Sequence, residues 1–234
     1  VYKKYDGTKA LWIDKAIRPK EAFLDYSLLE SIPQKVIVNA GVDALAHVIG
    51  ALSCEACNIM EHMISTQVAV SILKALPKSC RKDADARAVM HVCAHLAGDE
   101  IENAGGGLEH KLDMFAKAYH LPHGEVIGIF LPYTMLYLIR ENHYLDIAKQ
   151  LGMPGETPCE KQRALVDLIW KIYDEIGLPK TLRETGIPEE EFIAAIPSYI
   201  EMVKEIGHIY WIKGFQGDDT LGGLYKQAYY GLAE

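Results

Sequence analysis

The chain has 234 residues, of which half are hydrophobic and 24% are charged, as is typical of a globular protein with a sizeable buried core. Its net charge of −8, without any cluster of lysine or arginine, excludes nucleic acid as an expected partner. No apolar run approaches the roughly 18 residues of a membrane span, so we expect no membrane partner. Five cysteines and no secretory leader indicate a reduced, cytoplasmic protein.

The first residues favour a β-hairpin. Asp6-Gly7 lies between short alternations of polar and apolar residues within 1–13, which is a typical hairpin pattern. A second extended piece is expected over Ala22–Asp25. Because a lone hairpin is only marginally stable in water, these strands need something to pack against. The chain also begins with valine and enters strand-like residues at once, so we expect a fragment of a longer protein.

From Leu28 onward the apolar spacing is helical. The expected helices are Val36–Ser53, Ile59–Leu76 ended by Pro77, one from Asp83 or Asp85 to about Asn103, Leu108–Tyr119, Gly124–Arg140, His143–Leu151, Thr157–Ile176, Pro188–Ile206 and Thr220–Leu232. Gly124–Arg140 is apolar on nearly every side and predicts a central buried helix kinked by Pro132. Thr157 and Glu160 have the spacing of a capping box. The fold class expected is mainly α, an antiparallel helical domain with a short N-terminal hairpin or extended segment.

Two residues of the first long helix are candidate metal ligands. Asp43 and His47 are four residues apart, so they share one helix face. Their neighbours Val42, Leu45 and Val48 are apolar, which places the pair on a largely buried helix. A carboxylate in such a place is costly unless it is paired or binds a metal ion. This face therefore predicts half of a metal site.

Two further histidines lie in tightly shaped segments. His110 follows the three glycines of NAGGGLEH, and His123 stands between proline and glycine in YHLPHG. Either histidine alone is more often an ordinary hydrogen-bonded residue. Together with Asp43 and His47 they would form a set of three nitrogen ligands and one oxygen ligand, which suits Fe(II), Zn, Co or Ni better than Mg or Ca. Glu109, Glu125 and Asp113 are near enough in sequence to orient these ligands.

Rival sites are also present in the sequence. His91 and His95 are four apart, with Asp99 one turn further on, but no glycine-shaped or proline-shaped segment accompanies them. Cys54 and Cys57 form a C-x-x-C pair without the second pair of a zinc knuckle. Nucleophile elbow, Walker loop and G-x-G-x-x-G patterns are absent, and the run Gly105–Gly107 does not follow a strand as a phosphate loop would.

Three segments taken together resemble one family. GVDALAH (Gly41–His47), NAGGGLEH (Asn103–His110) and YHLPHG (Tyr119–Gly124) are similar to segments of the iron-containing, or group III, alcohol dehydrogenases. Phe23-Leu24-Asp25 resembles the end of that family's N-terminal domain, and GLPKTLRETGIPEEEF (Gly177–Phe192) resembles a late segment of it. The resemblance therefore extends over nearly the whole chain.

This resemblance implies an architecture and a reaction. Residues 1–27 would be a strand segment of an absent nucleotide-binding α/β domain, and residues 28–234 the helical metal-binding catalytic domain, inactive alone. Asp43, His47, His110 and His123 would hold Fe(II), or Zn. The ion would polarise the oxygen of a small alcohol or aldehyde while hydride passes to or from NAD(P). A face exposed where the absent domain would pack would also favour homo-oligomers.

The chain departs from the family pattern at two positions. The family usually places another histidine one turn after the third ligand, near the nicotinamide, whereas this chain has Asp113-Met114 there. We expect Asp113 to take the catalytic role at that turn. The glutamate that often follows the first histidine is Gly50 in this chain.

Two alternatives remain open at this point. The chain would be a helical module that binds a metal or a partner without turnover, since the cofactor domain and the extra histidine are missing. Alternatively, it would belong to an enzyme of the glycerol dehydrogenase or dehydroquinate synthase type, which shares the metal domain.

Overall fold

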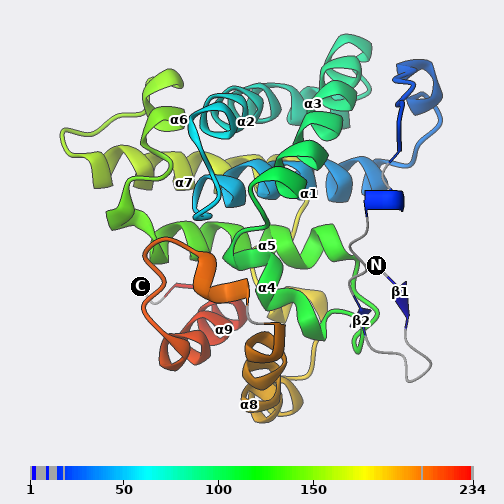
Figure 1. Ribbon diagram of the computed structural model, residues 1–234. Coiled ribbons are helices and arrows are strands. Elements are labelled where there is room, and N and C mark those ends of the chain that lie inside the picture. Colours follow the sequence, from blue (N-terminus) through cyan, green and yellow to red (C-terminus); the bar gives the residue numbers. More distant parts are fainter. Residues whose placement is uncertain (1, 4–8, 11–14, 18, 207, 233–234) are drawn as a thin grey trace.

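The computed structural model describes residues 2–3, 9–10, 15–17, 19–206 and 208–232, and these are mainly α-helical (Figure 1). The helices are α1 (Gln34–Leu52), α2 (Ile59–Cys80), α3 (Ala84–Asn103), α4 (Leu108–Leu112), α5 (His123–Tyr137), α6 (Leu145–Gln150), α7 (Pro158–Ile176), α8 (Glu189–Ile206) and α9 (Leu221–Tyr230). Short 3-10 helices lie at Lys15–Ile17, Tyr26–Leu29, Asp113–Phe115, Ile139–Glu141, Arg183–Thr185, His208–Trp211 and Asp218–Thr220. This confirms the predicted fold class.

The N-terminal hairpin is present as two short strands. β1 (Tyr2–Lys3) pairs antiparallel with β2 (Lys9–Ala10). The predicted Asp6-Gly7 turn lies outside the described residues. The predicted extended piece at Ala22–Asp25 is irregular chain that leads into the 3-10 helix at residues 26–29. No strand among the described residues pairs with it, so its β-like composition alone does not make a strand.

Helix α1 lies at the centre of the domain and packs against α2, α3 and α5 (Figure 1). Among the described residues, α1 is the one helix long and apolar enough to cross a membrane. However, 61% of its most apolar 18-residue stretch is buried inside the protein. Its apolar composition is therefore that of a core helix. Because its small residues Ala44, Ala46 and Gly50 are buried, neighbouring helices can approach it closely.

Helix α5 separates two hydrophobic clusters. Ile127 and Leu131 belong to the cluster shared with α1, α2, α3 and α7, while Ile129 and Phe130 belong to the cluster formed with α4, α8 and α9. A helix packed on both sides is apolar all round. The prediction of a central buried helix in this region is thus confirmed.

Two helix ends differ most from the prediction. Helix α2 continues through Pro77 to Cys80, because a proline in the last turn removes only one hydrogen bond and the side chain of Arg87 donates to the carbonyl of Ser79. Helix α4 ends at Leu112 instead of continuing to Tyr119. The chain tightens there into the 3-10 turn that inserts Phe115 into the second cluster. In both places tertiary contacts override the local pattern.

Candidate metal centre

Helix α1 presents Asp43 and His47 on one face, one turn apart, as their spacing predicts. The Nε2 atom of His47 lies 3.5 Å from Oδ1 of Asp43. The adjacent residues Val42, Leu45 and Val48 are fully buried and fix the rotation of the helix. Asp43 and His47 themselves are only partly exposed, at 26% and 18% of their side-chain surface. The two side chains therefore lie at the wall of the core, with one edge open.

His110 comes from helix α4, which begins after Gly107. Its side chain is 7% exposed, and its Nε2 atom lies 3.5 Å from Oδ1 of Asp43. The other ring nitrogen, Nδ1, lies 2.9 Å from the carboxylate of the neighbouring Glu109. His110 is thus held between two carboxylates.

His123 is the first residue of helix α5 and follows Pro122, whose extended conformation directs the chain into the helix. Its Nε2 atom lies 3.6 Å from Oδ1 of Asp43, and its Nδ1 atom donates to the carboxylate of Asp113 at 2.5 Å. With 44% of its side chain exposed, His123 lies on the open side of the cluster.

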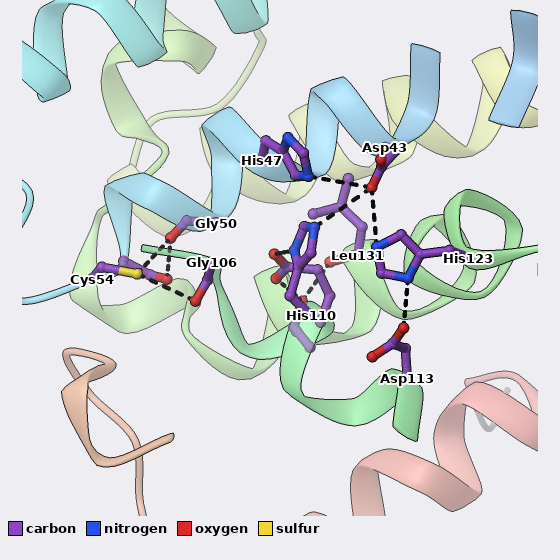
Figure 2. A network of polar contacts seen from close by, with 12 residues as sticks. Asp43, His47, Gly50, Cys54, Gly106, His110, Asp113, His123 and Leu131 are labelled. Carbon is purple, nitrogen blue, oxygen red and sulfur yellow. Dashed lines mark hydrogen bonds and ion pairs between the residues drawn. The ribbon is translucent and has the colours of Figure 1, made fainter. Parts of the chain in front are cut away.

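The four predicted ligands therefore converge, with three imidazole nitrogens around one carboxylate oxygen (Figure 2). Asp43, His110 and His123 each offer one donor atom within 4.8 Å of the others, the one such group of three or more found among the described residues. His47 joins them through Asp43 and through ring contact with His110, at 4.8 Å between centroids.

These distances fit a shared cation better than hydrogen bonds. At 3.5–3.6 Å the nitrogens are too far from the Asp43 oxygen for good hydrogen bonds. Ligand atoms about 2.1 Å from a tetrahedral ion are separated from one another by about 3.4 Å. Asp43 Oδ1 and His110 Nε2 are moreover buried without a hydrogen-bond partner. The residues present thus fit an iron or zinc ion.

The electrostatics of the cluster agree with this fit. Burial would raise the pKa of Asp43, but the three nearby imidazoles, above all that of His110, lower it below its usual value. Burial and the charge of His110 lower the pKa of His47 to about 4, so its imidazole is neutral at pH 7. Burial would also lower the pKa of His110, but Asp43 and Glu109 outweigh it and raise this pKa to about 9. His110 thus keeps a proton that a metal ion would replace.

Two of the imidazoles are also held at their second nitrogen. Glu109 does this for His110 and Asp113 for His123, as suggested from their positions in the sequence. Glu125 differs, because its carboxylate lies 3.5 Å from Lys35 rather than on a ligand.

One supporting residue was not found from the sequence. The hydroxyl of Thr134, on helix α5, donates to the carbonyl of Leu131 at 2.9 Å and lies 3.4 Å from the carboxylate of Glu109. It is 1% exposed and is a polar residue within an otherwise apolar stretch. That contrast is the sequence signal that could have identified it.

The rival histidine pair forms no comparable cluster among the described residues. His95 lies 3.8 Å from Asp99 on the surface of α3. His91 instead borders a small apolar hollow next to Gly41 and Met90. Neither histidine belongs to a group of three potential ligands.

Cys54 of the C-x-x-C pair and the glycine run both lie where α1 meets the turn before α4. The Cys54 thiol lies 3.5 Å from the carbonyl oxygens of Gly50 and Gly106, and burial raises its pKa to about 12, so it remains protonated. The run Gly105–Gly107 connects α3 to α4, and its residues Gly105 and Gly106 line a hollow of about 730 Å³ together with Trp211.

Comparison with known proteins points to a single family. The profile of the Fe-containing alcohol dehydrogenase family, C-terminal domain, matches residues 37–204. The chain is 34% identical to the NADPH-dependent butanol dehydrogenase of Clostridium saccharobutylicum over 76% of this chain and 47% of the relative. It is 31% identical to an alcohol dehydrogenase of Thermococcus barophilus over 92% of this chain and 55% of the relative.

A solved structure agrees with these sequence matches. The iron-containing alcohol dehydrogenase from Thermococcus thioreducens superimposes with a TM-score of 0.81 and 26% identity, covering 94% of this chain and 57% of that one. The chain thus spans about half the length of the relatives it matches.

Proposed function

The chain belongs to the Fe-containing alcohol dehydrogenase family, as its helical C-terminal domain, and on that premise we propose that it is the metal-binding part of an NAD(P)-linked alcohol dehydrogenase or aldehyde reductase. The observation that carries this proposal is the convergence of three imidazole nitrogens on the Asp43 carboxylate. The alcohol and aldehyde chemistry is that of the longer relatives.

Asp43, His47, His110 and His123 are the proposed ligands, and Fe(II), or Zn, the proposed ion. When bound, such an ion acts as a Lewis acid that polarises the oxygen of a small alcohol or aldehyde for hydride transfer. The protein's own part is to hold the four donors in place. His123, on the exposed side, leaves room for a substrate to approach, whereas His110 closes the buried side.

We propose a positioning role for Asp113 rather than direct contact with substrate. It is 3% exposed and accepts a hydrogen bond from Nδ1 of His123. A carboxylate behind a ligating histidine fixes the ring and the position of its proton. Met114, the other residue of the turn where the family usually has a histidine, cannot transfer protons and packs against the second hydrophobic cluster.

The proposed domain division is 1–27 and 28–234. We propose that NAD(P) is bound by a separate nucleotide-binding half, since this chain covers only about half the length of its relatives. Exposed apolar side chains support a packing partner for the first segment, since Phe23 is 88% and Tyr26 57% exposed. Contact through the same face would also allow homo-oligomers. The described cysteines are free, which agrees with a cytoplasmic location.

Two measurements test the proposal. The purified chain, reconstituted anaerobically, is expected to bind one equivalent of Fe(II) or Zn. Combined with the N-terminal half of the Thermococcus barophilus relative, it is expected to oxidise NADH or NADPH with short aldehydes. A metal-loaded complex without turnover would favour a non-catalytic module, and activity on glycerol alone would favour the glycerol dehydrogenase type.

A further inference from the structure

Helix α1 and the turn before helix α4 touch through two glycines. A Cβ atom on Gly50 would lie 2.6 Å from the backbone nitrogen of Gly107, and a Cβ atom on Gly107 would collide with the Cα atom of Gly50. The Cys54 thiol connects the same two segments, since it lies 3.5 Å from the carbonyls of Gly50 and Gly106. We call this contact the glycine crossing. It requires glycine at both positions, because any side chain would push the segments apart.

The carboxylate of Glu109 fills the space that these two glycines leave. A Cβ atom on Gly107 would lie 2.5 Å from its Oε1 atom, and a Cβ atom on Gly50 would meet the same oxygen. The Glu109 side chain is only 3% exposed. A buried carboxylate is costly unless specific partners compensate it. Its close partner is Nδ1 of His110 at 2.9 Å, and the hydroxyl of Thr134, which also donates to the carbonyl of Leu131 at 2.9 Å, lies 3.4 Å away.

His110 consequently has a carboxylate at each ring nitrogen. When its Nδ1–H group donates to Glu109, the lone pair of Nε2 points towards Asp43, where the other two imidazoles also point. The ring cannot turn away without breaking the bond to Glu109 in a space closed by the glycine crossing. An outer carboxylate of this kind also increases the basicity of the ligand.

We propose that Glu109 is a positioning residue of the metal centre, held by the glycine crossing so that it sets both the orientation of His110 and the position of its proton. The inference rests on the proposed metal centre and goes beyond it. It assigns to a buried carboxylate and two close-packed glycines a role in metal affinity, whereas packing alone would give them a role in stability only.

The test uses the chain loaded with Co(II), whose visible absorption reports the ligand geometry. Glu109→Ala removes the carboxylate, and Glu109→Gln keeps an oxygen that can accept from Nδ1. Glu125→Gln is the matched control, because Glu125 is also buried and near a ligand but pairs with Lys35. Co(II) affinity is measured by competition with a chelator, and far-UV circular dichroism checks the fold.

Glu109→Ala is expected to lower Co(II) affinity about 10–100-fold and to alter the absorption bands. Glu109→Gln should recover most of the affinity, and the control should stay within about threefold of the parent, as expected for the loss of a charge that contacts no ligand. Parent-like affinity and bands in a folded Glu109→Ala variant would overturn the inference alone. Failure of the parent itself to bind Co(II) would overturn the metal centre and the inference with it.

Discussion

The Nδ1 atom of His123 lies 2.5 Å from the carboxylate of Asp113, while the Nε2 atom of the same ring faces Asp43 at 3.6 Å. His123 is the most exposed of the proposed ligands that contact Asp43, at 44%. A ring so exposed is fixed by few packing contacts, so the bond to Asp113 determines where its second nitrogen points. The orientation of the exposed ligand His123 thus depends on Asp113, which is itself buried.

Replacing Asp113 with alanine is expected to weaken binding of Fe(II) or Zn about 10–100-fold, because His123 loses the acceptor that orients it. Chelator competition measures this change. The control is Asp146→Ala, which breaks a similar aspartate–histidine pair, with His62 at 3.1 Å, away from the metal centre. Equal affinity in the two variants would contradict the positioning role.

Replacing Asp43 with alanine should abolish stoichiometric metal binding, because all three imidazoles converge on its carboxylate. We expect the affinity to fall more than about 100-fold, beyond the effect of losing an outer carboxylate. Elemental analysis after gel filtration gives the metal content. His95→Ala, in the rival pair on α3, should keep a full equivalent. If His95→Ala loses the metal and Asp43→Ala keeps it, the site has been placed wrongly.

Substitution of Gly124 by alanine is expected to destabilise the chain by about 1–3 kcal/mol, because the new Cβ atom would lie 2.8 Å from the carbonyl carbon of Asn39. That contact joins α5 to α1, so metal affinity should fall too. Urea unfolding measures the change in stability. Gly98→Ala, at an exposed α3 position with nothing within 4 Å, should instead gain up to about 1 kcal/mol of helix propensity. Similar losses in both variants would show that the close contact with Asn39 is not the cause.

The stability of the chain should depend on pH through Glu100. Its side chain is 1% exposed and accepts a hydrogen bond from Ser65 at 2.6 Å, and burial raises its pKa. A carboxyl group with a raised pKa in the folded state favours folding most when protonated. Stability is therefore lost as the pH rises from the usual glutamate pKa through the raised one.

Glu100→Gln removes that loss, so the variant should be more stable than the parent at pH 7 and close to it at pH 4. Urea unfolding at both values checks this expectation. Glu102→Gln, the same change of charge at an exposed position of α3, is the control. A parent and a Glu100→Gln variant with parallel pH profiles would argue against a buried, destabilising carboxylate.

Local sequence signals predicted much of the scaffold. The capping box of Thr157 and Glu160 predicted the start of α7, which the structure confirms, and the helix ends at Ile176 as expected. The spacing of Asp43 and His47 placed both on one helix face. These features depend on residues within one or two turns of each other, which sequence patterns capture well.

The other features depend on contacts between distant segments. Helix α4 ends at Leu112 because Phe115 packs into a cluster built from α5, α8 and α9. The positions of Glu109 and Asp113 could be suggested from sequence, but only the fold shows that their carboxylates reach the rings of His110 and His123. The need for glycine at position 50 could likewise not be predicted from the sequence, because it arises from the contact with Gly107 in the fold.

Anomalous diffraction at the metal absorption edge, from a crystal of the chain grown with one equivalent of Fe(II) or Zn, tests directly whether the four side chains share an ion. We expect one strong peak about 2.0–2.2 Å from the Asp43 carboxylate and from Nε2 of His47, His110 and His123. A metal-loaded crystal whose peak lies elsewhere, for example between His95 and Asp99, would contradict it.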